Sequence, residues 1–74
     1  MPLNSKESAQ LRDFGANVRR ERSAKGMTQE RLAELTDLNI RTVQKIEAGE
    51  INILLTTVLR VREALRCGWM MLSP

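Results

Sequence analysis

Several residue types that build common functional sites are absent or nearly absent from this sequence. It has no histidine and one cysteine, Cys67, so zinc sites of the Cys/His kind and intrachain disulfides are excluded. No apolar run approaches the roughly 20 residues of a membrane-spanning helix. The N-terminal segment MPLNSKESAQ lacks the basic-then-apolar order of a signal peptide. These absences predict a cytoplasmic protein with a reduced thiol, no metal and no other cofactor.

Prolines and aromatic residues are also scarce. Pro2 and Pro74 stand at the two ends, and the interior is rich in strong helix formers without an alternating apolar pattern, so strands are not expected. A chain of 74 residues hides only about 60–65% of its unfolded surface, and two aromatic residues add little to its core. We therefore predict one small all-α domain that spans residues 1–74.

Charge gives an ambiguous indication of the partner. The net charge is +3 and the isoelectric point is near 9.8, which favours a polyanionic partner. However, residues 27–50 carry three basic and five acidic side chains, a net charge of −2. Composition therefore does not establish nucleic-acid binding, and the placement of charges on helix faces must decide it.

The apolar spacing predicts five helices. Leu11, Phe14 and Val18 share one stripe of the first helix, for which Ser5 or Ser8 is the expected N-cap. Thr28 and Asn39 are the expected N-caps of the next two helices. The expected helices cover residues 8–24, 29–35, 40–47 and 55–65, and residues 68–72 form a final turn or short helix.

Residues 29–48 read as two short helices joined by a turn, Thr36-Asp37-Leu38. Asp37 is one of the few non-glycine residue types that tolerate the left-handed region, and Gly49 ends the second helix. Helices of two turns are not stable alone, so both must pack on the rest of the chain. The expected inward residues are Leu32, Ala33, Leu35, Leu38, Val43 and Ile46, which leaves Arg41, Thr42, Gln44 and Lys45 outward on one rigid surface. That is the geometry of a helix-turn-helix.

These residues resemble the helix-turn-helix of the lambda-repressor/Cro family, also called the XRE family. The segments FGANVRRERSAKGMTQ and TTVLRVREAL are similar to the family's first and fourth helices, so the resemblance covers residues 11–65. It implies a compact five-helix lambda-repressor-like domain, most similar to restriction–modification controller proteins and phage Cro-like regulators. The family pattern is present here as Gln29, Leu32-Ala33, Asp37-Leu38, Val43, Ile46 and Glu47-Ala48-Gly49.

The resemblance implies that residues 40–47 enter the DNA major groove. Arg41 and Lys45 can donate hydrogen bonds to guanine, and Gln44 can pair with adenine. Ile40, which we expect to be exposed, can touch a thymine methyl group. The alternative is that these side chains only form a solvated helix face.

Other polar residues are candidates for DNA contacts. Gln29 opens its helix, where free backbone N–H groups favour a phosphate, and Thr42 can bond a phosphate or remain hydrated. Asn39 already has a structural role as an N-cap, and Asn52 lies in a loop. For each of these two residues, a DNA contact and a role without DNA are both open. The predicted DNA-binding residues are Gln29, Asn39, Ile40, Arg41, Thr42, Gln44, Lys45 and Asn52.

Two charges are expected on inner helix faces, Arg22 and Glu47. An unpaired buried charge is costly, and the family resemblance implies that these two residues pair and tie the first helix to the third. Their role is then structural and not catalytic.

The C-terminal end, residues 66–74, is unusually apolar. Four large apolar residues in a row cannot all face inward from one helical turn, and exposed apolar patches mark partner surfaces. Leu72 is expected to complete the core. The residues predicted for a homodimer interface are Leu54, Trp69, Met70 and Met71.

The resulting hypothesis is a dimeric, sequence-specific transcription regulator, bacterial or phage-encoded, that associates with the nucleoid when it binds a near-palindromic operator. The alternatives are an antitoxin that represses its operon and binds a toxin, or a protein-interaction module that reuses the fold. An enzyme is disfavoured, because no paired carboxylates or nucleophile–base pair stand out.

Overall fold

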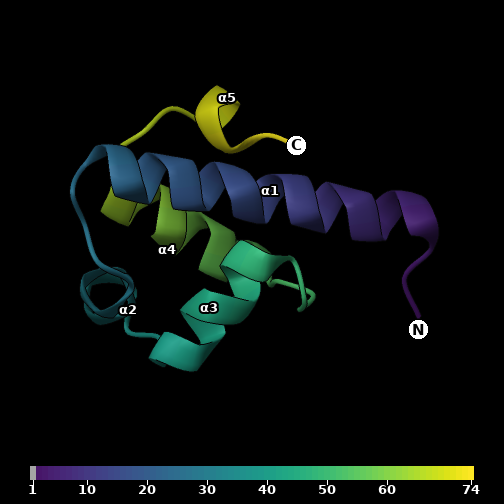
Figure 1. The fold of residues 1–74 in the computed structure, drawn as a ribbon, viewed down its shortest axis with the longest axis horizontal. Helices are drawn as coiled ribbons and strands as arrows, with labels where there is room; N and C mark the ends of the chain where they lie inside the picture. The colour runs from purple at the N-terminus through teal and green to yellow at the C-terminus, as the bar shows by residue number, and fades with distance from the viewer. Residues whose placement is uncertain (1) are drawn as a thin grey trace.

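The computed structural model describes residues 2–74, which form five helices and no strand. In Figure 1, α1 crosses the molecule, with α2, α3 and most of α4 on one side of it and α5 on the other. The predicted five-helix all-α fold is confirmed. The helices are α1 (Ser5–Ala24), α2 (Gln29–Thr36), α3 (Ile40–Ala48), α4 (Leu55–Leu65) and α5 (Trp69–Leu72).

The start of α1 differs from the sequence prediction. The helix begins at Ser5, and its N-cap is Asn4, so the prediction of Ser5 or Ser8 as N-cap was wrong. Asn4 Oδ1 accepts a hydrogen bond from the Glu7 backbone N–H at 2.8 Å, and the Glu7 carboxylate accepts one from the Asn4 N–H at 3.0 Å. This reciprocal capping box satisfies two backbone donors and extends the helix to Ser5.

The turn between α2 and α3 is set by local side-chain chemistry. The Thr28 and Asn39 side chains cap α2 and α3 by accepting hydrogen bonds from backbone N–H groups, as predicted. Asp37 adopts the left-handed conformation with φ 56°, also as predicted. Thr36 belongs to α2 and not to the turn, where the sequence analysis placed it. Its side chain is buried, and its hydroxyl donates to the Leu32 carbonyl of the preceding helical turn at 2.7 Å.

The core joins the inner faces of all five helices. Leu35 was predicted to line it but is 44% exposed. Successive residues of a helix are about 100° apart, so Leu32, Ala33 and Thr36 cover the inner side of α2, and Leu35 lies at its edge. Leu72 is completely buried, as predicted. The core residues are Phe14, Val18, Leu32, Ala33, Val43, Ile46, Val61, Leu65 and Leu72.

A glycine allows α1 and α3 to approach closely. A Cβ atom added to Gly15 would lie 2.2 Å from the Ile46 carbonyl oxygen and 2.7 Å from that of Glu47. Real Cβ atoms do not approach backbone oxygens so closely, so any larger residue here must push α3 away from α1. Gly15 therefore sets the position of the helix that carries the outward polar residues.

The short helix α5 is attached to α1 by polar side chains. Asn17 Nδ2 donates to the carbonyl oxygens of Leu72 at 3.2 Å and Ser73 at 3.0 Å. Arg20 Nη2 donates to the Met71 carbonyl at 2.7 Å. These bonds satisfy carbonyl groups that the end of a helix leaves without partners, and they fix α5 although it has a single turn.

Candidate nucleic-acid interface

The outer side of α3 presents a polar surface whose orientation is set by burial on the opposite side. Val43 and Ile46 are each only 1% exposed, and their packing fixes the rotation of the helix. Arg41, Gln44 and Lys45 are consequently exposed to solvent. We call these three residues together with Thr42 the recognition face.

Two residues near the start of α3 are less accessible than the sequence suggested. Thr42 is half-buried. Ile40, predicted to be exposed for a thymine contact, is partly buried and packs against the core. Its apolar side chain is used at the first turn of α3 to cover the core, so only part of it faces outward.

Glu50 lies beside the recognition face and was not selected from the sequence. A shallow hollow on this surface is lined by Arg41, Gln44, Lys45 and Glu50. Glu50 follows Gly49, whose left-handed conformation with φ 70° turns the chain back past α3. A carboxylate at this place can accept a hydrogen bond from cytosine and repels phosphate. Glu50 is brought beside these residues by the turn after α3, and no sequence motif predicts this placement.

Arg22 and Glu47 are in direct contact between α1 and α3. Arg22 Nε lies 2.6 Å from Glu47 Oε2, and Arg22 Nη2 lies 3.1 Å from Glu47 Oε1. The third guanidinium nitrogen, Nη1, donates to the Met27 carbonyl at 2.7 Å. Bidentate pairs of this kind are the strongest charge-assisted hydrogen bonds, so Arg22 joins α1, the α1–α2 turn and α3.

The protonation of Arg22 follows from this contact. The hydrogen bond to Glu47 raises the pKa of the Arg22 guanidinium, with burial opposing it and the charges of Glu47 and Glu30 adding to it. Because the folded-state pKa is raised, the stabilisation is fully present below the ordinary pKa of arginine. It is lost only as the pH rises through the higher folded-state value, so Arg22 stays charged at neutral pH.

Gln29 shares the same carboxylate. Its Nε2 donates to Glu47 Oε1 at 3.0 Å, so the first residue of α2 is held by the end of α3. An amide nitrogen carries two hydrogens, and the bond to Glu47 uses one. The bond to Glu47 therefore fixes the position of the Gln29 side chain at the start of α2.

The two asparagines proposed for DNA contacts lie in different settings. Asn39 is exposed, and its Oδ1 accepts a hydrogen bond from the Arg41 backbone N–H at 2.8 Å. Asn52 is exposed between Ile51 and Ile53, which are partly buried against the core. The loop before α4 thus anchors itself with isoleucines and presents Asn52 to solvent.

Exposed apolar side chains extend beyond the predicted group. The exposed fractions are 74% for Leu54, 47% for Trp69, 89% for Met70 and 46% for Met71. Leu55 and Leu59 are also exposed, at 68% and 46%, although the sequence analysis did not assign them to an interface. They stand four residues apart on α4 and therefore on one face of it.

Comparison with known proteins identifies the family. The family described as Helix-turn-helix matches residues 18–69, which is most of the chain. The chain belongs to this helix-turn-helix family, of the XRE type. It is similar in structure to the restriction–modification controller protein C.AhdI from Aeromonas hydrophila, with a TM-score of 0.82 and 38% sequence identity over 86% of this chain and 97% of that chain. No curated protein matches the sequence.

The family and the structural match make this protein a DNA-binding transcription regulator of the helix-turn-helix type. In the helix-turn-helix class, the second helix of the motif is the one offered to the major groove. None of the helices in residues 2–74 has the length and hydrophobicity needed to cross a membrane. Across the same residues, no group of three or more acidic or cysteine side chains is arranged to hold a metal ion.

Proposed function

We propose that this protein is a homodimeric regulator that reads a near-palindromic operator with α3 and controls transcription without catalysing a reaction. The observation that supports this most directly is the exposure of Arg41, Gln44 and Lys45 on a helix whose rotation is fixed by Val43 and Ile46. Such a rigid row of donors meets the requirement for base-edge recognition, since Arg and Lys donate to guanine and Gln pairs with adenine.

Other residues around α3 would position the protein on the DNA backbone. Gln29 is held at the N-terminus of α2 by Glu47, where backbone N–H groups and the helix dipole favour a phosphate. Asn39, Thr42 and Asn52 are the further candidates for backbone contacts, and Ile40 retains a partial apolar surface. Contacts of this kind fix register and orientation but carry no sequence information.

The homodimer would form through the exposed apolar group on α4 and α5. Leu54, Trp69, Met70 and Met71 are joined there by Leu55 and Leu59, which enlarge the apolar surface to be covered. A two-fold axis lets one surface cover its copy and presents two recognition helices to half-sites about 34 Å apart.

The similarity to a restriction–modification controller protein favours an equivalent role for this chain. In that role, residues 1–74 act as a DNA-binding domain in the cytoplasm. The predicted antitoxin and protein-interaction alternatives have no comparable support.

The experiment is selection of duplexes from a randomised DNA library by the purified protein, followed by sequencing of the bound fraction. We expect a symmetric consensus with two half-sites spaced by one helical turn, and affinity that falls steeply as salt rises. Bound sequences without a consensus would contradict sequence-specific recognition. An asymmetric single half-site would contradict the dimer.

A further inference from the structure

A shallow hollow at the recognition face combines hydrogen-bond donors with an acceptor. It is lined by Arg41, Gln44, Lys45 and Glu50 and has a volume of about 320 Å³. Arg41 and Lys45 offer only N–H donors, whereas an ionised Glu50 carboxylate offers only acceptors. The cations of α3 and the carboxylate that follows the helix therefore line the same space.

The position of Glu50 is fixed by the end of α3. Its backbone N–H donates to the Lys45 carbonyl oxygen at 2.9 Å, after the left-handed Gly49 has turned the chain. The Glu50 side chain is exposed, and no lysine or arginine nitrogen of residues 2–74 lies within 4 Å of its carboxylate. The carboxylate is therefore placed beside the recognition face and has no cationic partner there.

An unpaired carboxylate at this place makes binding depend on the base opposite it. On DNA it loses part of its hydration, and this loss is costly unless a hydrogen-bond donor of the DNA replaces the water. It also repels phosphate, so it adds nothing to the sequence-independent part of the affinity. Of the four bases, only cytosine and adenine present an amino donor in the major groove. Glu50 therefore penalises a guanine or thymine at this place, which is a means of specificity.

The order of donors and acceptor in the hollow matches one base pair. Read across the major groove, G·C presents the two guanine acceptors, N7 and O6, followed by the cytosine amino donor at N4. Inversion to C·G reverses this order, and A·T and T·A present no two adjacent acceptors. A cation followed by a carboxylate is therefore complementary to G·C.

We infer that Glu50 is a specificity-determining residue that reads the cytosine of one G·C base pair in each half-site. Lys45, whose backbone is bonded to that of Glu50, donates to guanine N7 and O6. Glu50 accepts from the amino group of the paired cytosine, so the two side chains read both strands at one position. This assignment rests on the proposed function, because it requires α3 to lie in the major groove.

The test is binding of the full protein to operators that differ from the selected consensus at one symmetric pair of positions. At one such pair, the unaltered protein should prefer G·C over C·G by about tenfold or more. Glu50→Ala should reduce this preference to about threefold or less and keep the preferences elsewhere. Lys45→Ala should lose discrimination at the same pair. If Glu50→Ala ranks every operator as the unaltered protein does, the inference is wrong.

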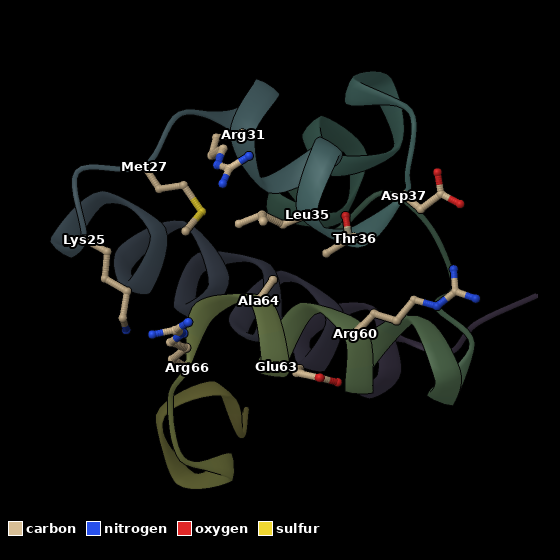
Figure 2. Close-up of a pocket in the computed structure, with 10 residues that line it drawn as sticks. All are labelled: Lys25, Met27, Arg31, Leu35, Thr36, Asp37, Arg60, Glu63, Ala64 and Arg66. Atoms are coloured by element: carbon tan, nitrogen blue, oxygen red, sulfur yellow. The ribbon is translucent and has the colours of Figure 1, made fainter.

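Glu63→Ala is the matched control for the change of charge. It removes the same charge from an exposed residue of α4. Glu63 lines a larger groove between α2 and α4, shown in Figure 2, to which α3 contributes no residue. This variant should rank the operators as the unaltered protein does. The same change of ranking in both variants would overturn the inference, because Glu50 would then act only through the net charge of the protein.

A modified base tests the contact without altering the protein. When N4-methylcytosine pairs with guanine, its remaining amino hydrogen lies in the base pair and the methyl group takes the place of the hydrogen that Glu50 would accept. This replacement should weaken binding of the unaltered protein by about tenfold. Glu50→Ala should lose little, because alanine has no bond to lose and leaves room for the methyl group. Equal weakening of both proteins would place the cytosine away from Glu50 and contradict the inference.

Failure of this inference can be distinguished from failure of the proposed function. A protein that binds all duplexes alike contradicts sequence-specific recognition and the role of Glu50 with it. A protein that selects a symmetric consensus, in which no G·C pair responds to Glu50→Ala, contradicts the role of Glu50 alone.

Discussion

Arg22 on α1 and Glu47 near the end of α3 form a two-pronged ion pair with N–O distances of 2.6 and 3.1 Å. The exposed fraction is 13% for the Arg22 side chain and 4% for that of Glu47. The pair connects the first helix to the recognition helix, so it acts on the position of α3 as well as on stability.

Removal of one partner should cost more stability than removal of both. Arg22→Met should lower the free energy of unfolding by about 3 kcal/mol, because Glu47 would remain buried without its cation. The double variant with Glu47→Leu should lose less than the single variant. Denaturant unfolding of all four forms gives the coupling energy, and purely additive losses would show that the two side chains do not stabilise each other.

Gly15→Ala should be strongly destabilising. The added Cβ would meet the Ile46 and Glu47 carbonyl oxygens at 2.2 and 2.7 Å, and overpacking of this kind costs about 1–3 kcal/mol or more. Gly68→Ala is the matched control, because nothing lies within 4 Å of its Cβ position. Thermal unfolding followed by circular dichroism should show a large loss for Gly15→Ala and almost none for Gly68→Ala. Similar melting temperatures would mean that α1 and α3 can separate freely.

Gln29→Ala should weaken binding to every DNA sequence by the same factor. A phosphate contact carries no base information, and Gln29 is neutral, so the salt dependence of binding should stay as in the parent protein. Titrations of operator and random duplexes at several salt concentrations measure both quantities. A loss confined to one operator sequence would assign Gln29 to base recognition instead.

Met70→Glu and Trp69→Ala should shift sedimentation toward monomer and weaken operator binding without reducing helical circular dichroism. Met70 is 89% exposed, so the change costs little within one copy but places a charge in the proposed interface. Leu3→Glu makes a similar change at another exposed apolar residue and should leave the dimer intact. A parent protein that remains monomeric at tens of micromolar would end the dimer proposal.

Local chemistry was readable from the sequence because each signal depends on a few neighbouring residues. Thr28, Asn39 and Gly49 mark the ends of α2 and α3, and Asp37 marks the turn, as the structure has them. The start of α1 at Ser5 was missed although its signal is also local, because the pairing of Asn4 with Glu7 was not recognised as a capping box.

Features that depend on the approach of distant segments were not readable. Nothing in the sequence around Gly15 indicates that the α3 carbonyl groups of Ile46 and Glu47 lie against it. The burial of Ile40 and the exposure of Leu35 follow from how α2 and α3 rotate on the core, and apolar spacing alone does not fix that rotation. The groove between α2 and α4 likewise combines Arg31 and Arg60, which only the fold brings to one place.

The central claim is that the recognition face of α3 reads bases, and binding of Arg41→Ala to a panel of operators tests it most directly. Each operator in the panel differs from the selected consensus at one base pair. The account predicts that Arg41→Ala loses discrimination at one symmetric pair of positions, at a cost of about 1–3 kcal/mol, and keeps it elsewhere. If the variant ranks every operator as the parent protein does, α3 does not read bases through Arg41, and the account is wrong.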